Sequence, residues 1–310
     1  EIALRLVGSE MCIRDRTTVI AKDTPAFIGN RIGIFSIMSL FHTVKQMGLT
    51  IEEVDKLSGP VIGRPKSATF RTVDLVGLDT LVHVANGIKE NCPGDERLEL
   101  FEMPDFIATM MDNKWLGSKT GQGFYKKTKD SKGATKILSL DLNTLEYRAA
   151  QKGKFATLEL TKSVDNVADR FKILVNGKDK AGTFYRKTMA ALFGYVTHRI
   201  PEIADELYKI DDAMKAGFGW QHGPFEIWDA IGLEAGIEIM KAEGHQPASW
   251  IEDMLAAGHT SFYCVKQGAT YYYDIASKTQ IKVPGQDAFI LLDNISCLLY
   301  TSDAADDSDC

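Results

Sequence analysis

Apolar residues recur at helical spacing through most of the chain. After residue 25 the apolar positions fall on one face and predict a helix over residues 25–47, ended by Gly48. Asp23 and Pro25 supply a capping residue and a proline at the first helical position. A capping box at Thr50 starts another helix. Further helices are predicted over residues 70–76, 79–90, 105–117, 183–197, 201–216, 224–230, 233–242 and 247–257.

Short β-branched or aromatic runs separated by turn residues predict strands. They form two meanders, over residues 124–148 and 262–283, and two isolated strands, over residues 17–22 and 154–160.

The helical pattern is duplicated. Phe70, Asp74 and Gly77 return as Phe225, Asp229 and Gly232 at an offset of 155 residues, and a meander beginning Phe-Tyr follows each copy. We therefore predict a mainly α-helical chain of two tandem modules, each followed by a small β-meander.

The pattern changes suggest a division of the chain. The first helical module covers residues 25–125, and a meander and linker cover 126–178. The second module covers 179–260, and its meander covers 261–294. Residues 1–16 and 295–310 lack helical or strand periodicity and resemble translated sequencing adapters, so we expect both to be artefacts of a gene cut at both ends.

Composition narrows the function classes. A net charge of −6 argues against a nucleic-acid-binding face. The 5 scattered cysteines form no CxxC pair, which disfavours disulfides and zinc and suits the cytoplasm. The longest apolar run is too short for a membrane span. Neither a dinucleotide loop nor an HExxH metal motif is present, and we interpret residues 117–123 as a turn into the meander.

Asn30 is the one side chain that we single out for chemistry. Its neutral amide donates and accepts hydrogen bonds at once, which suits orienting a carbonyl or a hydroxyl. On spacing alone, a solvated or capping asparagine explains it better.

Three segments carry a resemblance to a known family. Residues 23–31 (DTPAFIGNR), 63–79 (GRPKSATFRTVDLVGLD) and 120–125 (TGQGFY) resemble the C-terminal part of L-3-hydroxyacyl-CoA dehydrogenases, most closely the bacterial proteins that fuse this enzyme to an enoyl-CoA hydratase. Residues 217–232 resemble the second helical domain of those proteins. The resemblance covers about residues 17–294.

The resemblance implies two helical domains of the 3-hydroxyacyl-CoA dehydrogenase C-terminal type, which is similar to the 6-phosphogluconate dehydrogenase C-terminal fold. It implies oxidation of a 3-hydroxyacyl-CoA of fatty-acid β-oxidation, with NAD bound by a separate Rossmann domain that also holds the catalytic His–Glu pair. Residues 17–24 would be the last strand of that domain. Only the family's helical-domain asparagine maps here, onto Asn30, as a group that orders the substrate. We therefore expect the isolated chain to bind no NAD and to be inactive.

Further expectations follow from the resemblance. Arg64, Lys66 and Arg71 form a basic cluster that could meet the CoA phosphates, although a solvated loop explains them equally well. Counting without gaps places Arg186 opposite Asn30, so we assign packing rather than chemistry to the second copy. The partners would be the acyl-CoA and the missing Rossmann and hydratase domains, and a homodimer stays open.

Two alternatives remain. One is a related β-hydroxyacid dehydrogenase, a class that often places a catalytic lysine in its long helix; here the candidate, Lys45, lies at the far end. The other is a non-enzymatic dimerisation or scaffold module of the same fold. Retention of Asn30 weighs mildly against the scaffold.

Overall fold

The computed structural model describes residues 18–129, 133–151 and 153–285. The two segments predicted to be artefacts, 1–16 and 295–310, lie outside these residues, as do residue 17 and residues 286–294. The described chain is mainly helical, with two three-stranded antiparallel sheets. The predicted fold class is confirmed.

The first half contains five α-helices and one sheet among its described residues, with single turns of 3-10 helix between them. The helices are α2 (Gly29–Met47), α3 (Ile51–Leu57), α4 (Phe70–Val76), α5 (Leu78–Asn91) and α6 (Asp105–Asp112), and the strands are β1 (Tyr125–Lys129), β2 (Thr135–Leu140) and β3 (Tyr147–Ala149); the 3-10 turns are η1 (Pro60–Ile62), η2 (Leu98–Phe101) and η3 (Ser118–Thr120).

The second half repeats this order after two added helices. The added helices are α7 (Ala156–Leu160) and α8 (Val167–Val175), and then come α9 (Lys180–His198), α10 (Leu207–Phe218), α11 (Pro224–Ile231), α12 (Leu233–Ala242) and α13 (Trp250–Ala256), with β4 (Tyr263–Lys266), β5 (Ala269–Asp274) and β6 (Thr279–Lys282).

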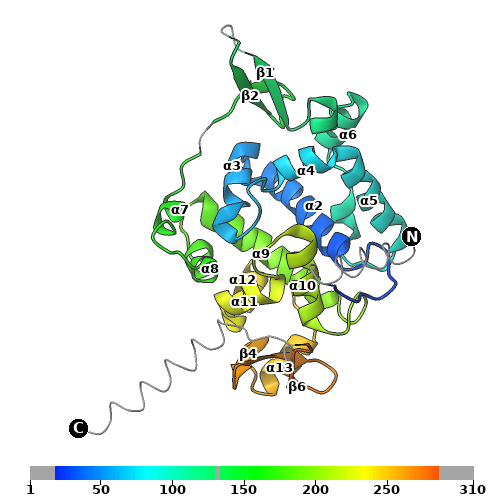
Figure 1. Ribbon diagram of the computed structural model, residues 1–310, viewed down its shortest axis with the longest axis vertical. Helices are drawn as coiled ribbons and strands as arrows, with labels where there is room; N and C mark the ends of the chain where they lie inside the picture. Colours follow the sequence, from blue (N-terminus) through cyan, green and yellow to red (C-terminus); the bar gives the residue numbers. More distant parts are fainter. Residues whose placement is uncertain (1–17, 130–132, 152, 286–310) are drawn as a thin grey trace, which may run out of the picture.

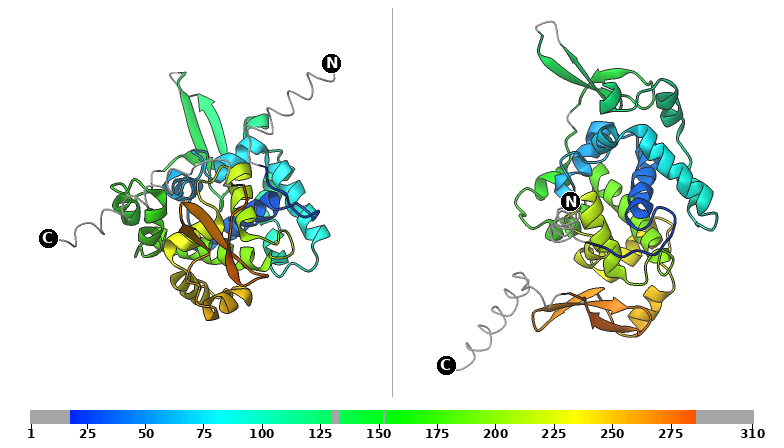
Figure 2. Two further views of the ribbon diagram at one scale, coloured as in Figure 1. Left: turned by 60° about the horizontal axis from the view of Figure 1, so that its bottom comes forward. Right: turned by 45° about the vertical axis from the view of Figure 1, so that its right-hand side comes forward.

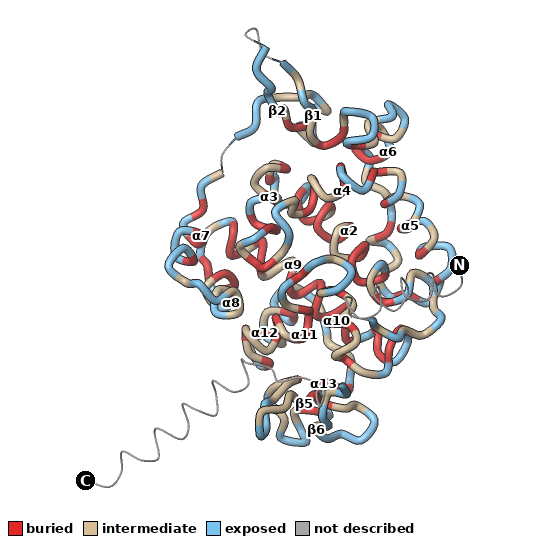
Figure 3. The backbone as a smooth tube through the Cα atoms, in the orientation of Figure 1, coloured by how far each residue is buried: buried red, intermediate tan, exposed pale blue. Residues whose placement is uncertain are grey.

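The long helices α2 and α9 pack together at the centre of the molecule (Figure 1). The rings of Phe35 and Tyr195 stack across this contact, with centroids 3.6 Å apart and planes within 2° of parallel. Such stacking adds to the burial of the two rings. Buried positions line both helices (Figure 3), so the two copies share one hydrophobic core.

The two meanders lie at opposite ends of the long axis, outside the helical body (Figures 1 and 2). Both have the strand order of a simple meander, β1-β2-β3 and β4-β5-β6, with antiparallel pairing throughout. Neither sheet contains a parallel pair joined by a crossover helix.

One aspartate fastens each meander to its helices, and it is buried in the first copy and half-buried in the second. The carboxylate of Asp74 accepts the backbone N–H groups of Phe124 and Tyr125, both at 2.8 Å. The carboxylate of Asp229 accepts those of Phe262 and Tyr263, again both at 2.8 Å. This clasp explains the aspartate found at the same place in both repeats.

A second aspartate completes each clasp. Asp55 accepts the backbone N–H of Phe70 at 2.7 Å and the hydroxyl of Tyr125 at 2.7 Å. Asp211 holds the second copy in the same way, since it accepts the hydroxyl of Tyr263 at 2.8 Å. The Phe-Tyr pair that opens each meander is therefore a structural signature, because its two N–H groups and its hydroxyl bind two aspartate carboxylates.

The predicted glycine turn before the first meander is confirmed. Residues 117–123 contain η3 and lead into β1. A Cβ atom on Gly123 would lie 2.1 Å from a carboxylate oxygen of Asp74, so only glycine fits beside the clasp.

The start of the long helix was predicted wrongly. It begins at Gly29 rather than at Pro25, because Ala26 and Phe27 adopt left-handed backbone conformations, with φ of 66° and 49°. Residues 18–22 form no strand. Instead Lys22 binds the second copy, through the carbonyl of Pro201 at 2.6 Å.

The linker was also predicted wrongly. The strand expected over 154–160 is helix α7, because Asp179 accepts both the N–H and the hydroxyl of Thr157 in its first turn. Helix α8 was not foreseen, although its cap, Asn166, could have indicated it. Helix α10 begins at Leu207 rather than at residue 201, after a turn.

No helix within the described residues is long and apolar enough to cross a membrane.

A candidate substrate cavity between the two copies

A cavity of about 380 Å³ lies against the first two turns of α2. Apolar side chains from α2, α4 and α5 line much of it, and hydroxyl groups of the loop before α4 line another part. Arg64 is the one charged side chain among the lining residues. The apolar lining contains Ile34, Ile37, Val73, Val76, Leu81 and Val84.

Asn30 lines this cavity from the first turn of α2. Its side chain is exposed and has no hydrogen-bond partner within the described residues. The first backbone N–H groups of any helix lack an intrahelical partner, and in α2 no side chain caps them. The amide of Asn30 and the helix terminus together offer several donors for an oxygen atom.

Two strained residues precede this turn. Ala26 and Phe27 both have positive φ, which costs a non-glycine residue about 1 kcal/mol or more. The ring of Phe27 is 57% exposed, which is unusual for phenylalanine in a folded chain.

The second copy supplies a wall of the cavity. Gly217, Phe218 and Trp220, at the end of α10 and just after it, all line it. The guanidinium of Arg64 lies 3.8 Å from the centre of the Trp220 ring, a cation–π contact. The resemblance had pointed to residues 217–232 only as a domain signature, and nothing in the sequence placed Phe218 or Trp220 beside Asn30.

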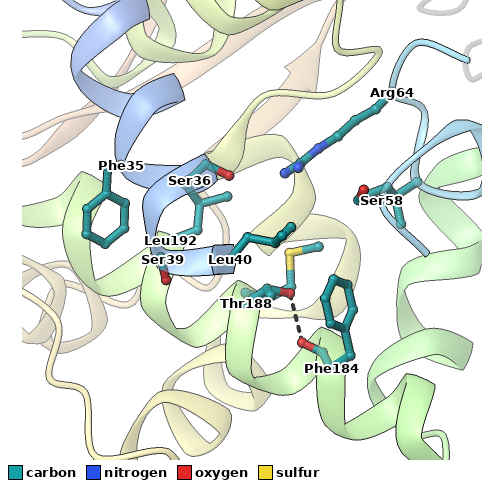
Figure 4. Close-up of a pocket in the computed structure, with 11 residues that line it drawn as sticks. Phe35, Ser36, Ser39, Leu40, Ser58, Arg64, Phe184, Thr188 and Leu192 are labelled. Carbon is teal, nitrogen blue, oxygen red and sulfur yellow. Dashed lines mark hydrogen bonds between the residues drawn. The ribbon is translucent and has the colours of Figure 1, made fainter. Parts of the chain in front are cut away.

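The side chain of Arg64 has no ion pair or hydrogen bond within the described residues, and its Nε is buried. Burial lowers the pKa of Arg64 to about 10, so the side chain stays charged at neutral pH. It also lines a much smaller cavity of about 10 Å³ between α2 and α9. Figure 4 shows its guanidinium pointing into that space on the side of Ser36.

The other two residues of the predicted basic cluster do not line the Asn30 cavity. Lys66 is exposed on the loop before α4. Arg71 lines a separate surface pocket together with Tyr125 and Lys127. Of the three cations, only Arg64 shares a cavity with Asn30.

A buried charge cluster holds the turn that carries Asn30. Arg31, which is fully buried, pairs with Asp95 at 2.8 Å and with Glu202 at 3.0 Å. Arg199 of the second copy pairs with the same two carboxylates, at 3.1 and 2.9 Å. The hydroxyl of Tyr195 accepts from Nε of Arg31 and donates to Asp95, each at 2.7 Å. No local pattern in the sequence indicates this cluster, because its members are far apart in the chain.

The remaining candidates lie elsewhere. Lys45 is at the opposite end of α2, 3.7 Å from Asp105, which disfavours a catalytic lysine at this site. Arg186 donates to the carbonyl oxygens of Val175 and Gly177, at 2.7 and 2.9 Å, within its own copy. Among the described residues no group of three or more His, Cys, Asp or Glu could hold a metal ion.

Comparisons with known proteins show which family and which relatives the chain resembles. The family model for the 3-hydroxyacyl-CoA dehydrogenase C-terminal domain matches it twice, over residues 27–127 and 184–272. A probable 3-hydroxyacyl-CoA dehydrogenase of Bacillus subtilis is 43% identical over 264 residues, which are 85% of this chain and 33% of that protein. The fatty acid oxidation complex subunit alpha of a Psychrobacter species is 29% identical over 259 residues, 80% of this chain and 32% of that protein.

The crystal structure of 3-hydroxybutyryl-CoA dehydrogenase from Escherichia coli has the same fold over 77% of this chain and 62% of that one, with a TM-score of 0.50 and 17% identity. The chain spans about a third of the length of the curated relatives that it matches. The double match covers both copies of the repeat, each with its helices and the start of its meander. The chain belongs to the 3-hydroxyacyl-CoA dehydrogenase C-terminal domain family.

Proposed function

We propose that this chain is the substrate-side helical part of an NAD-dependent L-3-hydroxyacyl-CoA dehydrogenase of fatty-acid β-oxidation. The observation that carries the proposal is the position of Asn30: an amide without a partner, at a helix N-terminus, on the edge of a largely apolar cavity. Such a cavity with a few polar groups suits a small ligand. Family membership supplies the substrate class.

In this proposal the amide of Asn30 donates a hydrogen bond to an oxygen of the acyl thioester. A donor fixed on a helix orients the substrate and stabilises charge that develops on that oxygen. The strained turn before Asn30 and the buried cluster around Arg31 keep this donor in place.

The described residues do not fit NAD. Both sheets are antiparallel meanders, and no strand–glycine loop–helix unit is present within the described residues. The NAD domain would belong to another part of the same protein, as would a hydratase domain in a multifunctional enzyme.

Binding of 3-hydroxybutanoyl-CoA, measured by calorimetry, tests the proposal on the chain itself. Asn30→Ala is expected to raise Kd by roughly three- to tenfold, the effect of one hydrogen bond. Asn113→Ala is the matched control, because Asn113 is an exposed asparagine outside the cavity; it should leave Kd unchanged. Equal affinity for wild type and Asn30→Ala would contradict the role of the amide.

A further inference from the structure

The second copy provides more to the Asn30 cavity than packing. The ring of Phe218 lies directly on Gly33, one turn along α2 from Asn30, so that a Cβ on Gly33 would come within 2.0 Å of the ring. The same ring is 3.9 Å from the Cβ position of Gly29. Phe218 therefore covers the backbone of the helix turn that presents Asn30.

The segment that carries Phe218 is firmly attached to the first copy. Gly219 adopts a left-handed conformation with φ of 65°, which turns the chain back after α10. The N–H of Gln221 donates to the carbonyl of Gly63 at 2.8 Å, and Trp220 stacks on Arg64. The wall is thus held by backbone and side-chain contacts from the first copy.

The duplication provides an internal comparison. Gly63 and Gly219 are both left-handed and lie 156 residues apart (219 − 63), as do Asp55 and Asp211 (211 − 55). By this offset Ile62 corresponds to Phe218. Ile62 is buried and lines the cavity of about 10 Å³ against α9, whereas Phe218 lines the cavity of about 380 Å³ against α2. Of these two cavities, the one beside Asn30 has room for a ligand and the one beside Ile62 does not.

The polarity of the lining side chains determines which part of a ligand fits this cavity. It contains no carboxylate, and its one charged side chain, Arg64, is engaged with the face of Trp220. The aliphatic side chains from α2, α4 and α5 offer no hydrogen bonds. A hydrocarbon chain suits this aliphatic part of the lining, beside which the amides of a pantetheine arm would lose their hydration without gaining partners. The hydroxyls of Ser67, Thr69 and Thr72, in the other part, are already bonded to protein oxygens.

We propose that the cavity binds the acyl chain of the substrate and that Phe218, from the second copy, limits the length of the chain that fits. This inference rests on the proposed function, which places the reacting end of the substrate at Asn30. It assigns to the second repeat a part in substrate selection.

The test measures Kd of the chain for 3-hydroxyacyl-CoA esters from butanoyl to hexadecanoyl length. Each added methylene should tighten binding roughly fourfold until the cavity is full. Phe218→Ala should move this limit to longer chains. Phe218→Leu, which keeps an apolar side chain, should move it less.

Tyr208→Ala serves as the matched control. Tyr208 is an aromatic residue of the same helix, but its ring faces Tyr272 of β5 with centroids 4.9 Å apart. It should leave the length limit unchanged. An identical limit in wild type and Phe218→Ala, with both proteins folded by circular dichroism, would overturn the inference.

Failure of the inference can be told apart from failure of the proposed function. Asn30→Ala should raise Kd by the same factor for esters of every length, without changing the longest chain that fits. A parallel series of n-alkanols, which lack the CoA group, reports on the cavity alone. One outcome is that the length limit for alkanols changes in the Phe218 variants but no CoA ester binds. This outcome would overturn the proposed function and would still support Phe218 as the residue that limits chain length. If neither series depends on Phe218, the wall is overturned.

Discussion

At the scale of the residue, contacts decide the role of each side chain more than residue type does. Asn30 could be singled out in the sequence only through the family resemblance, because one helical asparagine is not distinctive. Arg64 was a candidate phosphate contact, with a solvated loop as the equal alternative, and the structure shows its guanidinium stacked on Trp220. Phe218 could not be predicted at all, because it lies 188 residues from Asn30 (218 − 30) and no local pattern encodes that approach.

The contact between Gly33 and the Phe218 ring can be tested through the free energy of unfolding. In most helices glycine to alanine is stabilising by about 0.5–1 kcal/mol. Gly33→Ala should instead lower the free energy of unfolding, by about 1–3 kcal/mol, since its Cβ would meet the Phe218 ring. Denaturant unfolding measures this effect.

The matched control is Gly87→Ala, in α5, where a Cβ meets nothing within 4 Å. It should be neutral or stabilising. In the double variant with Phe218→Ala, much of the loss at Gly33 should be recovered. If Gly33→Ala and Gly87→Ala have equal effects, the close contact is absent in solution.

At the scale of the element, the spacing of apolar residues predicted the positions of most helices. It predicted their first and last residues less accurately. The capping box at Thr50 is confirmed by its reciprocal hydrogen bonds. Segment 154–160 was misassigned because a distant carboxylate, that of Asp179, determines its helical first turn. The duplicated meanders were predictable because each depends on an aspartate and a Phe-Tyr pair that recur in the sequence.

The clasp predicts a pH dependence of stability. Burial raises the pKa of Asp229 to about 7, because the hydration lost outweighs the two N–H bonds gained. The same carboxyl in the unfolded chain titrates near 3.9. Between about pH 4 and pH 7 the folded chain binds more protons, so this group's stability contribution is full below about pH 4 and is lost as pH rises to about 7.

Urea unfolding of wild type and Asp229→Asn across this range measures the difference. Asparagine does not titrate, so the free energy of unfolding of the variant should fall less steeply between pH 4 and pH 7. Parallel slopes would show that Asp229 has an ordinary pKa in the folded chain.

At the scale of the whole molecule, the two copies form one unit. Helices α2 and α9 share a core, and the charge cluster around Arg31 and Arg199 joins the copies beside the turn that carries Asn30. The sequence shows the duplication, but it does not show that the cavities beside equivalent residues of the two copies differ in size. Of the cavities beside the equivalent residues Ile62 and Phe218, the one at Phe218 is large enough for a ligand, and residues of the second copy form one of its walls.

Breaking the cluster should destabilise both copies together. Asp95→Ala leaves two buried guanidinium groups short of a partner, and we expect a loss of about 3–5 kcal/mol in a single cooperative transition. Asp253→Ala, which removes an exposed ion pair with Lys278, should have a far smaller effect, because solvent screens the pair. Calorimetric unfolding that separates into two transitions, or equal effects of the two variants, would contradict one shared unit.

The most direct test of the central claim is an NMR titration of the chain with 3-hydroxybutanoyl-CoA. If Asn30 and its cavity form the substrate side of a dehydrogenase, the side-chain amide signals of Asn30 and the indole N–H of Trp220 should shift together and saturate with one Kd. The side-chain amide of Asn113 should not move. Saturable shifts confined to the separate pocket around Arg71 and Lys127, or no shift at Asn30, would contradict the account.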